Sequence, residues 1–159
     1  MKRLVLLAVL AACGSNPVMV GGNYTVGVTN RDNGCMLANW TVGAMSSGIG
    51  VDITQSGSSA TATITGATAI VLDLSLGSHA FTGTVDGDTL DLKLLGTRPQ
   101  TSGNCTWTLD AEIIATSNGE LLTGRIDYTA ATNGHPDCTT MGLEGCVTYQ
   151  DFNGSRPPQ

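Results

Sequence analysis

Residues 106–129 read TWTLDAEIIATSNGELLTGRIDYT, and this stretch decides the fold class. On both sides of Asn118-Gly119, apolar and polar residues alternate with a period of two, the pattern of a strand with one dry and one wet face. Asn-Gly is typical of a tight hairpin turn, because both residues tolerate a positive φ. The stretch therefore predicts two antiparallel strands joined by a hairpin. Their inward-facing rows are expected to be Trp107, Leu109, Ala111, Ile113 and Ala115, then Leu122, Ile126 and Tyr128.

The same alternation continues on both sides of this hairpin, with turns at Ser56-Gly57 and Asp86-Gly87. The segment Ala67 to Gly77 fits a short helix or a strand, and Gly77, a suitable helix C-cap, favours the helix. Further inward rows are expected at Tyr24, Val26 and Val28; Val51 and Ile53; Ala60, Ala62 and Ile64; Phe81 and Val85; Leu90, Leu92 and Leu94; and Val147 and Tyr149.

These rows amount to about eight strands in successive hairpins, and an antiparallel sheet of that many strands usually closes on itself to hide its edges. We therefore predict an all-β fold, an antiparallel up-and-down β-barrel with one short helix near 67–77. A β-sandwich is the alternative, because the number of strands does not separate the two.

The connections between strands sort by length. The tight turns fall at one end of the barrel, and the long connections, near 30–50, 66–78, 97–104 and 133–145, fall at the other. Binding residues are concentrated on long loops held by a rigid scaffold, so ligand binding is expected at the second end. Trp40 is the large aromatic residue of the first long loop. It is a candidate ligand contact, and its alternative role is to plug the end of the core.

The first thirteen residues have the organisation of an export signal. Lys2 and Arg3 precede a short apolar run, which ends in Leu10-Ala11-Ala12-Cys13. This leader resembles the lipobox of bacterial lipoproteins; an uncleaved anchor or a buried strand is the alternative. The resemblance implies cleavage before Cys13, an acyl chain such as palmitate on that cysteine, and attachment to the cell envelope. By the same resemblance, the residue directly after the lipidated cysteine, Gly14, favours attachment to the outer membrane. The predicted divisions are a signal peptide (1–12), a lipidated tether (13–22), a barrel (23–153) and a flexible tail (154–159).

Five cysteines occur in the chain, and the lipid would occupy Cys13. The remaining four form an even set in an exported protein, which favours two disulfides over a metal site or a catalytic thiol. Three pairings are compatible with the sequence. The short spacing of Cys138 and Cys146 favours a bond between them, which leaves Cys35 to pair with Cys105.

Charge and motif content narrow the classes of partner. Without Lys2 and Arg3 the chain has five basic and thirteen acidic residues, a net charge of −8 that disfavours nucleic acid and anionic lipid. His79 and His135 have no second ligand at metal spacing and no nearby nucleophile. We therefore expect no catalytic residue, no metal and no cofactor.

The meander with a long first loop, over residues 23–152, is similar to lipocalin-like and avidin-like barrels and to small lipid-anchored barrels that inhibit lysozymes or proteases. The Gly-x-Trp motif of lipocalins is not present at the first strand, and two tryptophans are too few for the aromatic pocket of avidins. The expected function is a non-enzymatic, lipid-anchored envelope protein that binds a small apolar ligand or an envelope protein. The alternatives are a structural lipoprotein and an inhibitor of a secreted hydrolase. A narrow interior filled by side chains would leave binding to the loops alone.

Overall fold

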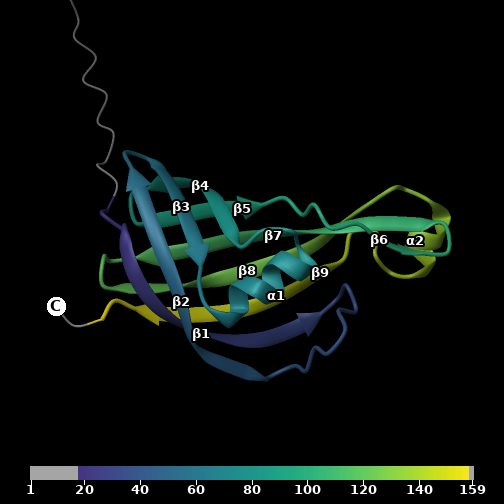
Figure 1. Ribbon diagram of the computed structural model, residues 1–159, viewed down its shortest axis with the longest axis horizontal. Coiled ribbons are helices and arrows are strands. Elements are labelled where there is room, and N and C mark those ends of the chain that lie inside the picture. The colour runs from purple at the N-terminus through teal and green to yellow at the C-terminus, as the bar shows by residue number, and fades with distance from the viewer. Residues whose placement is uncertain (1–17, 158–159) are drawn as a thin grey trace, which may run out of the picture.

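The computed structural model describes residues 18–157, which form a closed antiparallel barrel (Figure 1). The strands follow the order β5-β4-β3-β2-β1-β9-β8-β7-β6, and pairing of β5 with β7 closes the ring around eight of them. The predicted up-and-down barrel is confirmed. The barrel strands are β1 (Gly22–Asn33), β2 (Met45–Ser56), β3 (Ser59–Ile64), β4 (Ala80–Asp86), β5 (Thr89–Leu94), β7 (Cys105–Ser117), β8 (Leu121–Thr132) and β9 (Val147–Ser155).

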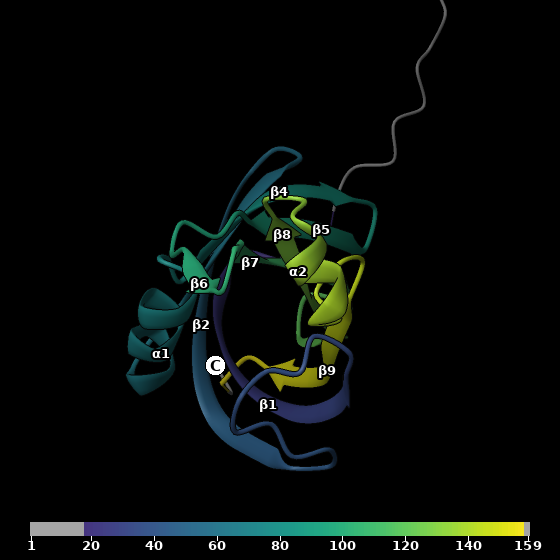
Figure 2. The ribbon, with the colours of Figure 1, turned by 90° about the vertical axis from the view of Figure 1, so that its right-hand side faces the viewer.

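Three shorter elements are added to the barrel. The helix α1 (Ala67–Ser75) confirms the predicted short helix, and the strand β6 (Gln100–Ser102) pairs only with β7 among the described strands. A second helix, α2 (Pro136–Thr140), interrupts the connection that was expected to be a loop. Figure 2 looks onto the end of the barrel where α1 and α2 lie on opposite sides of the axis. Within residues 18–157, no helix has the length and apolar character needed to cross a membrane.

The inner face of the barrel matches the predicted rows except on the last strand. Phe81, Leu90 and Leu92 are each 1% exposed and lie in the main core. On β9 the prediction of Val147 and Tyr149 as the inward row is wrong, because both lie on the outer face and the inner row begins one residue later in the chain. That inner row is Thr148, Gln150 and Phe152.

Hydrogen bonds explain the register of β9. The side chain of Thr148 is fully buried, and its hydroxyl accepts a hydrogen bond from the Cys35 amide at 2.9 Å and donates one to Asn33 Oδ1 at 3.0 Å. Tyr149 instead lies on the outer face, where the guanidinium of Arg125 is 3.7 Å from its ring centroid. A satisfied polar side chain can be buried, and an aromatic ring covered by a cation can face solvent.

The barrel has a tight-turn end and a long-loop end, as predicted. The Val18 amide donates a hydrogen bond to Gly87 O at 2.8 Å, so the described chain begins at the tight-turn end. Arg156 lies there as well, because its amide donates to Glu120 O at 3.0 Å. Val20 is fully buried and β9 continues to Ser155. Both Val20 and Ser155 therefore belong to the barrel structure, while Cys13 and the leader lie outside the described residues.

Two disulfides form, but the predicted pairing of Cys35 with Cys105 and of Cys138 with Cys146 is wrong. The bonds are Cys35–Cys146 and Cys105–Cys138. Strands β1 and β9 pair with Asn33 opposite residue 148, so the same register two residues further on brings Cys35 opposite Cys146. The helix α2 carries Cys138 to the start of β7, where Cys105 lies. The short segment between Cys138 and Cys146 thus crosses from β7 to β9.

Candidate ligand-binding cavity

The barrel encloses a cavity of about 470 Å³, within the range of small-molecule sites in proteins. Its wall is formed mainly by aliphatic side chains from the barrel strands, including Ile53, Leu92 and Ile113. Small residues such as Ala62 and Ala115 also line it, and their short side chains leave space inside the barrel. The interior is therefore not completely filled by side chains.

The cavity reaches the surface at the long-loop end. Its lining there includes Trp40 from the β1–β2 loop and Val71 from α1. Val71 is 62% exposed to solvent while it lines the cavity, so this side chain marks the mouth. Ile70 and Leu74 of the same helix do not line the cavity and are 62% and 71% exposed, so α1 carries further apolar side chains on its solvent side next to Val71.

A chain of polar side chains crosses the inner wall below the mouth. The Tyr128 hydroxyl donates a hydrogen bond of 2.9 Å to Gln150 Oε1, and Gln150 Nε2 donates one of 2.7 Å to Asn30 Oδ1. These residues come from the neighbouring strands β8, β9 and β1, and Tyr128 and Gln150 line the cavity. Burial raises the pKa of the Tyr128 phenol far above its ordinary value, so the phenol stays neutral.

Two contacts fix the position of Trp40 beside Tyr128. Its indole Nε1 donates a hydrogen bond of 2.8 Å to Arg31 O, and its ring meets the Tyr128 ring edge to face with centroids 6.1 Å apart. Aromatic pairs favour this arrangement. The structure thus places Trp40 on the cavity wall, and its contact with a ligand stays a prediction.

The cavity is electrically neutral. None of the side chains that line it within residues 18–157 is charged. Charged side chains nearby form ion pairs away from the cavity. Arg31 Nε lies 2.7 Å from Asp151 Oδ2 and Lys93 Nζ lies 2.8 Å from Glu112 Oε1, and all four side chains are partly exposed to solvent. The polar part of the site therefore consists of uncharged hydroxyl, amide and indole groups.

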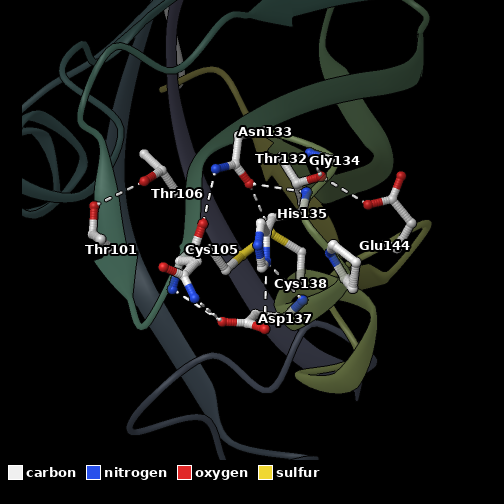
Figure 3. Close-up of a disulfide and its surroundings, with 12 residues drawn as sticks. Thr101, Cys105, Thr106, Thr132, Asn133, Gly134, His135, Asp137, Cys138 and Glu144 are labelled. Atoms are coloured by element: carbon white, nitrogen blue, oxygen red, sulfur yellow. Dashed lines mark hydrogen bonds and ion pairs between the residues drawn. A yellow bond between two sulfur atoms is a disulfide. The ribbon is translucent and has the colours of Figure 1, made fainter.

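The remaining long-loop residues form an outer lobe, which we define as β6, α2 and the ends of β7 and β8 joined by the disulfide Cys105–Cys138 (Figure 3). His135 Nδ1 accepts a hydrogen bond from the Asp137 amide at 3.2 Å and so caps α2. Asp137 Oδ2 accepts two hydrogen bonds from Asn104, at 3.0 Å from its backbone amide and 3.1 Å from its side chain. Across residues 18–157, no cluster of three metal-ligating side chains occurs.

Comparison of the chain with protein-family models, with curated proteins and with solved structures found no match. The resemblances of the leader to lipoproteins and of the barrel pattern to lipocalin-like proteins stay predictions.

Sequence reasoning identified Trp40 but missed the polar group beneath it. Tyr128 was expected inside only as an apolar residue, while Asn30 and Gln150 were not considered. A signal for Gln150 was present, because Phe152 is two residues away and the alternation of a strand places both on one face. The aromatic Tyr149 masked that signal, since it suggested the opposite face.

Proposed function

We propose that the protein is a non-enzymatic, lipid-anchored module of the cell envelope that binds a small apolar ligand inside its barrel. The single observation that carries the proposal is the cavity of about 470 Å³ with its aliphatic wall. An apolar ligand that enters such a cavity exchanges water for apolar contacts, a gain proportional to the area buried. Val71, which lines the cavity and is 62% exposed, offers the ligand an apolar contact at the mouth.

The proposed anchor fits this arrangement. The described chain starts at the tight-turn end, where the Val18 amide is hydrogen-bonded to Gly87 O. A lipid on Cys13 would therefore hold that end toward the membrane. The mouth would then face away from the anchoring membrane, where a ligand or an envelope protein can reach it. Cys13→Ser is expected to move the full chain from the membrane fraction to the soluble fraction, and its retention in the membrane fraction would argue against the anchor.

Ligand binding is tested on residues 15–159 purified from an oxidising compartment. Native and denatured masses are compared first, because a co-purified ligand is lost on denaturation. The neutral dye N-phenylnaphthylamine is then titrated, with an expected rise in dye emission and a change in tryptophan emission. Trp40→Phe is expected to remove most of the tryptophan change while dye binding continues. Absence of both a mass difference and a dye response would contradict the proposal.

A cavity-filling variant tests the place of binding. Ala62 lines the cavity, so Ala62→Phe puts a ring into the space and is expected to abolish dye binding. The matched control is Ala131→Phe, because Ala131 is exposed on β8 and does not line the cavity. Equal dye binding by both variants would place the dye outside the barrel.

The outer lobe favours a second candidate, an inhibitor of a secreted hydrolase. It extends beyond the barrel at the long-loop end and is stabilised by the Cys105–Cys138 disulfide (Figure 1). Rigid loops of this kind bind protein targets at low entropic cost. An inhibitor would lose activity on shortening of the β6–β7 turn at Gly103 and would be insensitive to Ala62→Phe, whereas a ligand carrier would show the opposite response.

A further inference from the structure

We infer that the ligand is an uncharged amphiphile, an apolar chain with a terminal hydroxyl group that hydrogen-bonds to Tyr128 and Gln150. This inference rests on the proposed binding function and names the chemical class of the ligand. The polar pair lies near the mouth, under Trp40, while the wall beyond it toward Leu90 and Leu122 is apolar. An elongated molecule fits this division with its polar end at Tyr128 and its chain directed toward the tight-turn end.

The neutrality of the wall excludes a charged end group at this position. A carboxylate or an ammonium placed beside Tyr128 would be removed from water without an ionic partner, and such burial is strongly unfavourable. The nearest arginine along β1, Arg31, is bonded to Asp151 at the surface and contributes its backbone carbonyl to Trp40. The site is therefore suited to a neutral group.

Tyr128 and Gln150 can each form one more hydrogen bond, and this capacity indicates which neutral group fits. The single hydrogen of the Tyr128 hydroxyl is given to Gln150 Oε1, which leaves the phenol oxygen as an acceptor. Gln150 Nε2 uses one hydrogen for Asn30 Oδ1 and has a second one to donate. One acceptor and one donor on adjacent side chains match a hydroxyl group, which both donates and accepts. A carboxylate has no hydrogen to offer to Tyr128.

The length of the apolar wall is compatible with a chain-like ligand. On β8 the inner row runs from Tyr128 at the polar pair to Leu122, which is 4% exposed and lies near the hairpin at Asn118. Six strand residues span ~20 Å. The wall alongside is made of Ile113 and Ala115 from the paired strand β7. A linear chain is thus covered along its length.

The test compares three ligands of equal chain length: decyl alcohol, decanoate and decyl methyl ether. Each displaces N-phenylnaphthylamine from residues 15–159 at neutral pH. We expect the alcohol to bind about tenfold or more tightly than the carboxylate, and about fivefold more tightly than the ether, which lacks the donated hydrogen. Acidification should strengthen binding of the acid as it becomes neutral and leave binding of the alcohol unchanged.

The variant Tyr128→Phe with Gln150→Leu removes both polar partners, and it is expected to bring the affinities for the alcohol and the ether within about twofold of each other. Tyr149→Phe is the matched control, because its hydroxyl lies on the outer face beside Arg125. Should the double variant fail to fold, the ligand series on the unaltered protein still decides the question.

The outcomes separate the two proposals. Equal binding of decanoate and decyl alcohol, with dye binding intact, overturns the neutral ligand class and leaves the binding function standing. Failure of the dye and of all three ligands to bind overturns the binding function itself. A preference for the alcohol that persists in the double variant overturns the assignment of the hydroxyl site to Tyr128 and Gln150.

Discussion

The Nε of Arg156 donates a hydrogen bond of 3.0 Å to the hydroxyl of Tyr24. The same guanidinium donates through Nη2 to Met19 O at 3.1 Å and to Gly21 O at 2.7 Å, and the Tyr24 hydroxyl in turn donates to Val20 O at 3.0 Å. The residue that follows β9 thus fastens β1 and the segment before it at the tight-turn end. This contact links β1 and β9 at the end of the barrel opposite the disulfides.

Replacement of this arginine tests how much the contact contributes. Arg156→Ala removes three hydrogen bonds from a charged donor, and we expect it to lower the free energy of unfolding by about 2 kcal/mol. Chemical denaturation measures the loss. Arg31→Ala is the control, because its ion pair with Asp151 is about half exposed and should contribute less than about 1 kcal/mol. Equal losses of unfolding free energy in the two variants would mean that Arg156 contributes no more than an exposed ion pair.

The two disulfides are expected to differ in their effects. Cys35–Cys146 closes a loop of 111 residues and Cys105–Cys138 one of 33, so in the chain-entropy model the first contributes about 1 kcal/mol more. Paired Cys→Ser variants and thermal unfolding check the order. Loss of Cys105–Cys138 should instead increase hydrogen exchange mainly in the outer lobe. Peptide mapping without reduction should recover both pairs, and a Cys138–Cys146 peptide would contradict the structure.

We expect the outer lobe to lose stability at low pH. Hydrogen bonds from the Asn104 backbone amide and side chain hold the pKa of Asp137 below its ordinary value. A carboxyl with a lowered pKa in the folded state stabilises it fully above the ordinary pKa of about 4 and loses that contribution as the pH falls below it. The Tm of the native protein should therefore fall more between pH ~5 and pH ~2.5 than that of Asp137→Asn.

An exposed carboxylate provides the control for this acid effect. Asp52→Asn, on the exposed face of β2, should keep the native pH profile. If Asp137→Asn and the native protein lose stability in parallel, the carboxylate does not tie the lobe to Asn104.

The exposed apolar side chains of α1 should affect the rate of ligand binding. Ile70 and Leu74 are exposed on α1 but do not line the cavity. The double variant Ile70→Ser with Leu74→Ser is therefore expected to slow association of N-phenylnaphthylamine severalfold with little change in its equilibrium affinity. Stopped-flow fluorescence measures both quantities. Ile114→Ser on the outer barrel wall, 53% exposed, should leave the rate unchanged.

The sequence was sufficient to predict the barrel because period-two alternation and Gly-containing turns are local signals. The hairpin around Asn118-Gly119 illustrates this. Its two strands pair as expected, and the turn is centred one residue later, between Gly119 and Glu120, because Ile113 pairs with Ile126 and Ser117 with Leu122. The position of the short helix also followed from local signals. Among the inward rows, that of β9 was misjudged, because Thr148 is polar and its buried partners come from another part of the chain.

The disulfides and the cavity depend on contacts between distant segments. The pairing of Cys35 with Cys146 follows from the register of β1 against β9, which no local pattern specifies. The polar pair has the same origin, since Tyr128 and Gln150 are brought together by the packing of β8 against β9. Cavity volume depends on the barrel geometry as a whole. Trp40 could be singled out because a large aromatic among small loop residues is visible without that geometry.

The contact of Arg156 with Met19 and Gly21 means that the two ends of the described chain are neighbours. The protein is therefore suited to circular permutation: a short linker from Pro157 to Val18 would join β9 to β1, and new termini could open at the Asn118-Gly119 turn. Domains with adjacent ends usually tolerate such rearrangement. A permuted chain would move the site of attachment to a different hairpin while β1 and β9 remain joined by Cys35–Cys146.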